Sequence, residues 1–185
     1  MKFKKKYLIA LTLIIIILTS YIYYGSNHVW EMEGTPKSQV LELRLEDRTL
    51  EVTIESYLEE ELDSLTYIKL TLTAPDVRKI YLIFNTRGVD GKGIQQITKA
   101  SGVIGYAIGL NEMNVLPREE DTIRRALIFS GFMGGKSMPI IYLKTPNVGG
   151  EKNRIILKDH IIILESESYE AISDLAQFIF NLLSG

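Results

Sequence analysis

Short apolar runs separated by helix-like stretches constrain the fold of this chain more than any other feature. The runs IYLIF (80–84), VIGYAIGL (103–110) and MPIIYL (138–143) follow one another, with polar stretches of helical pattern between them. Runs that are apolar on both faces are typical of parallel strands covered by helices. The sequence therefore predicts a parallel βαβαβ core with right-handed crossovers.

The stretch before this core alternates apolar and polar residues with the period of a β-strand. VLELRLEDRTLEVTIE (40–55) has a polar turn between two alternating halves, which predicts a hairpin. TYIKLTLTAP (66–75) resumes the alternation and predicts a third strand closed by its proline. We expect a β-meander over residues 40–75, followed by an α/β part over residues 80–185.

The C-terminal part of the chain predicts further helices and a second hairpin. A helix is expected from about Pro117, with Glu119, Glu120 and Asp121 at its positive end, so we interpret these carboxylates as structural. NRIILKDHIIILES (153–166) predicts a tight antiparallel pair of strands. Ser168 is expected to cap a final amphipathic helix.

The N-terminus carries four lysines followed by an apolar stretch from Tyr7 to Tyr24. Eighteen helical residues rise about 27 Å, close to the thickness of a bilayer's hydrocarbon core. Lysines on one flank and glutamates on the other predict a cytoplasmic N-terminus. The prediction is a single-pass protein of the cell membrane with its domain outside: a basic head (1–6), an anchor (7–24), a tether (25–39) and an extracytoplasmic α/β domain (40–185).

A cleaved signal peptide is the alternative interpretation of this segment. Cleavage normally requires small residues at positions −3 and −1 of the cut. Cuts after Ser20, Gly25 or Ser26 place a leucine or a tyrosine at position −3. The uncleaved anchor is therefore favoured, and cleavage remains open.

Composition excludes several kinds of site. The chain has no cysteine, which removes disulfides, thiolate metal sites and cysteine nucleophiles. His28 and His160 are its only histidines and have no neighbouring ligand pattern, so no zinc site and no cofactor are predicted. The net charge is −2 although four lysines precede the apolar stretch, so the domain itself is acidic and nucleic-acid binding is disfavoured.

The string SGFMGGKSMP (130–139) resembles a nucleotide-binding phosphate loop but fails its requirements. The loop requires a glycine five residues before its Gly-Lys-Ser, and that position holds Ser130. The string is also expected to leave a helix and enter a strand, whereas a phosphate loop leaves a strand and enters a helix. A Ser130–Lys136 nucleophile–base pair lacks both a nucleophile elbow and a Ser-x-x-Lys motif. Neither catalytic interpretation is favoured.

Ligands of open parallel sheets bind beyond the carboxyl ends of the strands. The three predicted strands would bring three polar loops to that edge, at residues 85–93, 111–114 and 145–150. The first loop precedes a predicted helix N-terminus and offers Arg87 and Lys92 to an anion. The candidate ligand-binding residues are Asn85, Arg87, Gly88, Asp90, Gly91, Lys92, Asn111, Glu112, Asn114 and Asn147.

The lysine-headed, isoleucine-rich N-terminus, the absence of cysteine and the ending NRIILKDHIIILESESYEAISDLAQFIFNLLSG resemble short signal-anchored extracytoplasmic proteins of hyperthermophilic archaea, a group with no assigned activity. The resemblance implies a location and no site residue. The predicted function is a binding or accessory component of the cell envelope or of a membrane complex, with the bilayer and a protein as partners. The alternative is a small-ligand or anion-binding domain that uses the three loops. A hydrolase built on Asp90 and Glu112 has no supporting spacing.

Overall fold

The computed structural model describes residues 12–16, 19, 35–45, 48–58, 62–111, 113–119 and 137–185. The chain divides into two units, Met1–Met32 and Glu33–Gly185. In the first unit, the described residues 12–16 are helical. The second unit contains the sheet and the hydrophobic core.

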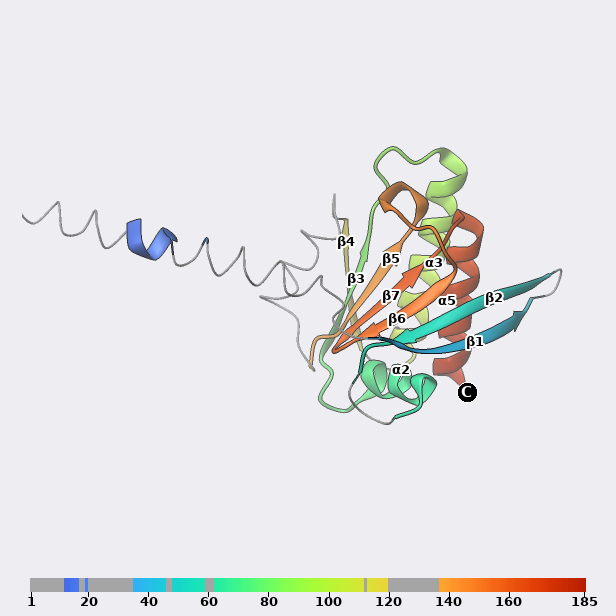
Figure 1. Ribbon diagram of the computed structural model, residues 1–185, viewed down its shortest axis with the longest axis horizontal. Helices are drawn as coiled ribbons and strands as arrows, with labels where there is room; N and C mark the ends of the chain where they lie inside the picture. Colours follow the sequence, from blue (N-terminus) through green and yellow to red (C-terminus); the bar gives the residue numbers. More distant parts are fainter. Residues whose placement is uncertain are drawn as a thin grey trace, which may run out of the picture. The chain divides into compact units, whose positions relative to one another are not determined.

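A mixed seven-stranded sheet organises the second unit, in the order β1-β2-β6-β7-β5-β3-β4 (Figure 1). Strands β3, β4, β5 and β7 run parallel to one another, while β2 and β6 run in the opposite direction. The strands are β1 (Lys37–Arg44), β2 (Thr49–Ser56), β3 (Lys79–Phe84), β4 (Asn114–Glu119), β5 (Ile140–Lys144), β6 (Arg154–Lys158) and β7 (Ile161–Glu165).

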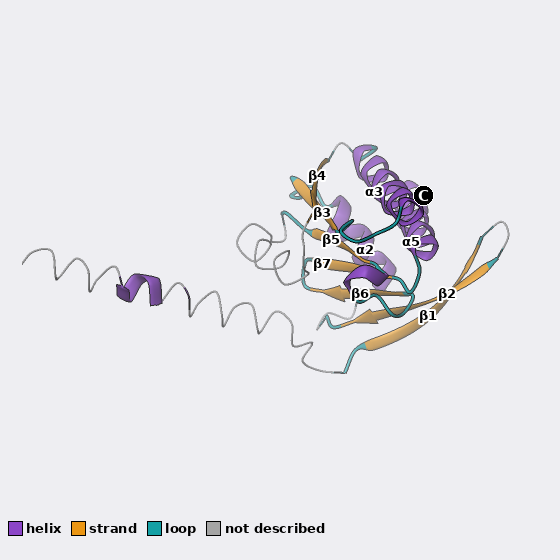
Figure 2. Cartoon of the chain, turned by 90° about the horizontal axis from the view of Figure 1, so that it is seen from above, coloured by secondary structure: helices purple, strands orange, loops and turns teal. Residues whose placement is uncertain are grey.

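Helices α3 (Gly91–Gly109) and α5 (Tyr169–Ser184) lie side by side on one face of this sheet (Figure 2). The core fills the space between these helices and the strands, and the shorter helix α2 (Ser64–Thr73) contributes Ile68 and Leu72 to it. A 3-10 turn, η1 (Pro146–Val148), follows β5. The opposite face of the central strands is also buried, with Tyr81, Ile83, Ile140 and Tyr142 at most 4% exposed.

Side-chain caps define where helices α2, α3 and α5 begin. The side chains of Asp63, Asp90 and Ser168 accept hydrogen bonds from the third residue beyond each of them. Each bond satisfies one N–H group that the first helical turn leaves without a partner. The cap predicted at Ser168 is confirmed, as are the hairpins β1–β2 and β6–β7.

The strand predicted at 66–75 is wrong, because this segment forms most of α2. Its alternating Ile68, Leu70 and Leu72 suggested one buried strand face. In the structure Ile68 and Leu72 are buried one helical turn apart, whereas Leu70 is 50% exposed. The Asp63 cap, which accepts from the Thr66 N–H at 2.9 Å, stabilises the helix start.

The strand predicted at 103–110 and the helix predicted near Pro117 are also wrong. Residues 103–109 continue α3, whose buried Ile97, Ala100, Ile104 and Ala107 recur with helical spacing. Residues 114–119 form strand β4, which pairs in parallel with β3. Proline is tolerated there because β4 is an edge strand. The fold is therefore of the α/β class, as predicted, but the sheet is mixed rather than parallel. Its second parallel strand along the chain is residues 114–119, rather than the predicted 103–110.

The prediction of a membrane anchor is corrected as well. Most of residues 7–24 lies outside the described part of the chain. Among the residues that the structure does describe, no helix is both long enough and apolar enough to cross a membrane. This finding contradicts the transmembrane helix in the predicted fold, and with it the signal-anchor interpretation and the cell-membrane location.

Helix α3 contains glycines that its packing does not require. A Cβ atom added at Gly102 would meet no atom within 4 Å. Glycine within a helix costs roughly 0.5–1 kcal/mol relative to alanine. We expect Gly102→Ala to raise the free energy of unfolding by about that amount, measured by urea denaturation. Gly93→Ala is the contrasting change, since its Cβ would lie 2.4 Å from Val89 Cγ1, and a loss of stability with Gly102→Ala would contradict the prediction.

Candidate functional site

The loops after β3 and β5 meet at the carboxyl edge of the sheet, as predicted. The Asn147 side-chain amide donates to Asn85 Oδ1 at 3.2 Å and also to the backbone carbonyls of Asn85 and Arg87. Thr145 Oγ1 donates to Asn147 Oδ1 at 2.6 Å. Asn85 is buried and also accepts from the Arg87 N–H. These amides therefore join the two loops to each other.

The N-terminus of α3 follows the first loop and is closed by its own cap. Asp90 Oδ1 accepts from the Gly93 N–H at 2.7 Å. Gly93 has no side chain to separate the helix from the ring of Tyr169, which an added Cβ would approach within 2.9 Å. Gly88 makes the turn with a φ of 73°. Because a carboxylate already occupies the positive end of this helix, the arrangement is less suited to an anion than the sequence suggested.

The other predicted site residues do not join this cluster. Asn114 opens β4 and pairs with Lys79 at the start of β3, so it lies at the opposite edge of the sheet from Asn85. Asn111 lies just beyond the C-terminus of α3, where its side chain donates to the Ala107 carbonyl at 3.0 Å. Glu112 lies outside the described residues. The three-loop site fails because residues 103–110 form a helix rather than a strand.

The remaining predicted site residues are exposed. Arg87, Gly88, Asp90, Gly91 and Lys92 all lie on the surface of the first loop and the start of α3. Residues 130–136, which contain most of the phosphate-loop-like string, lie outside the described part of the chain. Its described end leads into β5, and the Ser137 carbonyl accepts from the Arg78 N–H.

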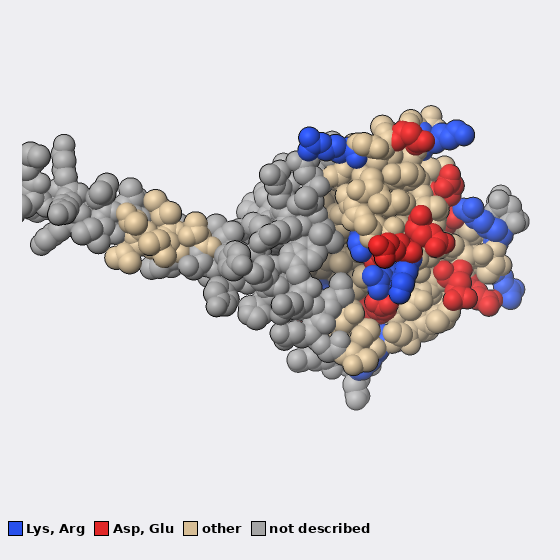
Figure 3. All heavy atoms as spheres, turned by 45° about the horizontal axis from the view of Figure 1, so that its top comes forward, with Lys and Arg blue, Asp and Glu red and all other residues tan. Residues whose placement is uncertain are grey.

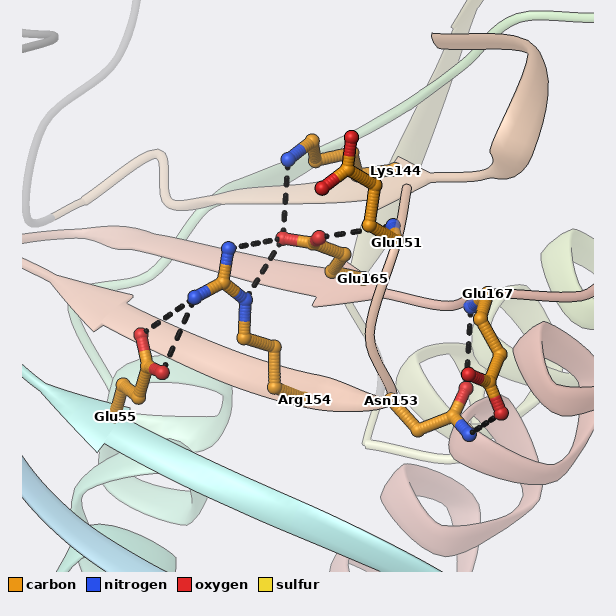
Figure 4. Close-up of polar contacts among 7 residues, drawn as sticks. All are labelled: Glu55, Lys144, Glu151, Asn153, Arg154, Glu165 and Glu167. Atoms are coloured by element: carbon orange, nitrogen blue, oxygen red, sulfur yellow. Dashed lines mark hydrogen bonds and ion pairs between the residues drawn. The ribbon is translucent and has the colours of Figure 1, made fainter. Parts of the chain in front are cut away.

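A buried carboxylate that the sequence did not reveal lies at the end of β7. Glu165 is 1% exposed and accepts hydrogen bonds from Lys144 Nζ at 3.0 Å and from Arg154 Nε at 2.9 Å (Figure 4). The Glu151 backbone N–H donates to its other oxygen. Arg154 also binds both carboxylate oxygens of Glu55. We call Glu55, Lys144, Arg154 and Glu165 the strand-end charge network.

The strand-end charge network contains two cations and two carboxylates, so its charges balance. Each of the four side chains forms a hydrogen bond within it. Burial by itself raises the pKa of Glu165, but the Glu151 N–H, Lys144 and Arg154 outweigh it and hold that pKa below its usual value. A carboxylate ionised in this way does not exchange protons near neutral pH. The network is therefore suited to stabilising the sheet rather than to acid–base catalysis. Figure 3 shows positive and negative side chains intermixed on the face in view, rather than gathered by sign.

A cleft lies at the opposite, amino edge of the parallel strands. Its volume is about 730 Å³, and α2, the segment after β2 and the turn between β6 and β7 enclose it. The hydroxyl of Tyr67 donates to the Asp159 carbonyl and joins α2 to that turn. The cleft is lined by Tyr57, Leu58, Leu62, Tyr67, Leu70, Thr71, Ala74, Asp76, Val77, Asp159 and His160.

The described lining of the cleft contains carboxylates but no lysine or arginine. Asp76 and Asp159 are both exposed at its rim. Burial lowers the pKa of His160, although Asp159 opposes this effect, so the imidazole is neutral at pH 7. In the described structure, His160 Nε2 is buried and has no hydrogen-bond partner. The described lining thus carries two negative charges at pH 7 and no positive one.

Sequence reasoning missed this cleft because it placed residues 66–75 in a strand. The one available signal was the Asp63-Ser64-Leu65-Thr66 start, which is typical of a helix cap.

Among the described residues, the cleft included, no three His, Asp or Glu side chains come together as a metal site. No protein-family model matches the chain, and comparisons with curated proteins and with solved structures give no match.

Proposed function

We propose that this domain binds a small organic cation with an apolar body in the cleft between α2 and the β6–β7 turn. The observation that carries the proposal is a cleft of about 730 Å³ whose described lining has two carboxylates and no lysine or arginine. Pockets of roughly 300–1,000 Å³ accommodate small ligands, and a few polar or charged groups in the pocket orient the ligand. Here the charged groups are carboxylates, so they would orient a cation. A binding function also agrees with the binding role expected from the sequence.

The uncharged lining fits the body of such a ligand. Leu58, Leu70 and Val77 offer apolar surface, and Leu70 is half exposed although it has an apolar side chain. Tyr57 and Tyr67 also line the cleft, and aromatic rings attract cations through the ring quadrupole. The apolar side chains would exclude water from the ligand while the carboxylates at the rim attract its charge.

The alternative, an anion held by the loops at 85–93 and 145–150, has weaker support. Arg87 and Lys92 are exposed at that edge. However, Asp90 caps the helix N-terminus that would attract the anion, and the Asn147 amide bonds within the loops. An anion there would have to compete with these interactions.

The cleft proposal predicts selective binding of a cation. We expect benzyltrimethylammonium to raise the thermal midpoint of the full chain and phenylacetate, an anion of similar size, to leave it unchanged. The double substitution Asp76→Asn/Asp159→Asn should weaken cation binding roughly tenfold in isothermal calorimetry, because each exposed charge contributes up to about 1 kcal/mol. Binding should also weaken as the pH falls and His160 gains a proton, which adds a positive charge to the lining.

Two further variants make this test decisive. Glu151→Gln removes an exposed carboxylate whose side chain does not line the cleft, so it should leave binding unchanged. Leu70→Arg should abolish cation binding, since it places a positive charge on an already exposed lining position. Equal binding of the anion, or full binding by the Asp76/Asp159 variant, would exclude the proposal.

A further inference from the structure

Strand β1 forms one edge of the sheet and is long, regular and open. All eight of its residues pair with β2, and Lys37–Val40 are exposed, with Val40 at 59%. β2 pairs with β6 only through Thr53–Ser56, so the far half of the β1–β2 hairpin extends beyond the body of the sheet (Figure 1). The opposite edge, β4, contains Pro117, which hinders strand addition. β1 contains no proline.

The backbone of β1 presents unused hydrogen-bonding groups outward. On β2, the N–H groups of Thr53 and Tyr57 donate to the loop before β6 and to β6 itself. Even-numbered residues of β2 therefore bond to β1, where they oppose odd-numbered residues such as Leu41 and Leu43. The N–H and C=O groups of Ser38, Val40, Glu42 and Arg44 must then point away from the sheet. Within the described chain, none of these four residues has a further bonding partner.

Glu42 and Arg44, two charged residues of β1 near the hairpin tip, form no ion pair among the described residues. Glu42 lies directly opposite Glu51 on β2, a like-charge pair that destabilises the hairpin. In the described residues, neither carboxylate forms an ion pair. Arg44, on the same face and two residues along, forms none either. A partner strand that places a cation opposite Glu42 and an anion opposite Arg44 would therefore form ion pairs with both side chains.

We propose that the partner of β1 is β1 of a second copy of this chain, added antiparallel about a twofold axis at Leu43. In this register Glu42 lies opposite Arg44 of the second copy, and the reverse pair repeats across the axis. Leu41 then lies opposite Leu45 of the second copy, and the two Leu43 side chains face each other. The outward N–H and C=O groups of Glu42 and Arg44 bond across the interface, giving one sheet that continues through both copies.

Other registers suit the edge less well. An axis at Glu42 brings two carboxylates together, and an axis at Val40 leaves Glu42 opposite Ser38. An axis at Leu43 also places the contact between the two copies near the hairpin tip. The other end of β1 lies at Lys37, which pairs with Ser56 in the part of β2 that joins β6. The bodies of the two copies are thereby kept apart. This interface is independent of the cleft and of its proposed ligand.

Charge exchange tests the proposed pairing. Sedimentation velocity of the full chain should show a dimer that dissociates on dilution. Glu42→Arg or Arg44→Glu should weaken the dimer at least tenfold, because each places like charges opposite one another twice. The double variant Glu42→Arg/Arg44→Glu should restore it. Glu42→Arg also places an arginine opposite Glu51, so its thermal midpoint should not fall, and a loss of dimer cannot be attributed to unfolding.

A cysteine scan tests the register, since the natural chain has no cysteine. Under mild oxidation Leu43→Cys should form the intermolecular disulfide faster than Val40→Cys or Leu41→Cys, because only residue 43 faces its own copy. Fastest cross-linking at residue 40 or 41 would overturn the register. A chain that stays monomeric, a double variant that does not regain the dimer, or capture of an unrelated extended peptide by β1 would overturn the proposal.

Discussion

Replacing Gly150 by alanine should lower the free energy of unfolding by about 3 kcal/mol or more. Gly150 is buried beside the ends of β5 and β7. An added Cβ would lie 2.4 Å from the Ser166 carbonyl oxygen and 2.5 Å from that of Lys144. Both are backbone atoms, and the Lys144 carbonyl accepts from the Ser166 N–H at 3.0 Å, so neither can move without breaking the pairing. Urea denaturation followed by circular dichroism measures this loss.

The neighbouring glycine provides a matched control. Gly149 has a φ of 84°, but an added Cβ there would meet no atom within 4 Å. Gly149→Ala should therefore cost only the strain of the left-handed conformation, roughly 1–2 kcal/mol. Equal losses for the two variants would contradict the role assigned to the close approach of the Ser166 and Lys144 carbonyls to Gly150, whose φ is not positive.

Replacing Glu165 by glutamine should also lower the free energy of unfolding by about 3 kcal/mol at pH 7. The change leaves Lys144 and Arg154 without the carboxylate that both contact, and breaking a buried ion pair in this way is strongly destabilising. Because Arg154 retains Glu55 and is partly exposed, we expect the low end of the usual range. Glu151→Gln is the control, since only the backbone N–H of Glu151 belongs to this arrangement.

The effect of Glu165 should depend on pH with a definite sign. Its pKa is lower in the folded protein than its usual value near 4.5. The unfolded chain therefore binds the proton first as the pH falls, and the stability that Glu165 contributes is lost below about pH 4.5. The difference in the free energy of unfolding between the natural chain and Glu165→Gln should therefore shrink as the pH falls below about 4.5. A difference that stays constant as the pH falls through the acid range would contradict the role assigned to the carboxylate.

The elements that could be predicted from the sequence are those whose pattern has one structural solution. The hairpin β6–β7 has two apolar runs about a short turn, and the Ser168 cap precedes an unambiguous helical face. Strands β3 and β5 are short apolar runs, and a helix of that length would be unusual. Local pattern alone was sufficient in these cases.

The errors arose where apolar residues fit both periods. Ile68, Leu70 and Leu72 alternate as in a strand, yet the first and third also lie one helical turn apart. The run at 103–110 is apolar on every side, and only its continuity with the buried Ile97 and Ala100 reveals the helix. Packing against the sheet and against α5 decided these segments, and that information is not local.

The candidate site was only partly predictable for the same reason. The loops that hold Asn85, Arg87 and Asn147 meet because β3 and β5 are parallel neighbours, and both strands were predicted from their apolar runs. The cleft depends on α2, so it could not be found once that helix was assigned to a strand. The pair Arg154–Glu165 could have been predicted from the sequence, because the two residues are equidistant from the turn at 159–160 of the predicted hairpin.

The strand-end charge network also affects which strands can become neighbours during folding. Glu165 on β7 lies between Arg154 on β6 and Lys144 on β5. Electrostatic attraction to both cations therefore favours the placement of β7 between those two strands. Because successive residues of a strand face opposite sides, a slip of one residue would turn Glu165 toward the apolar side that packs on α5. A carboxylate cannot be buried there without a partner. One acidic residue thus selects both the order of the central strands and their alignment.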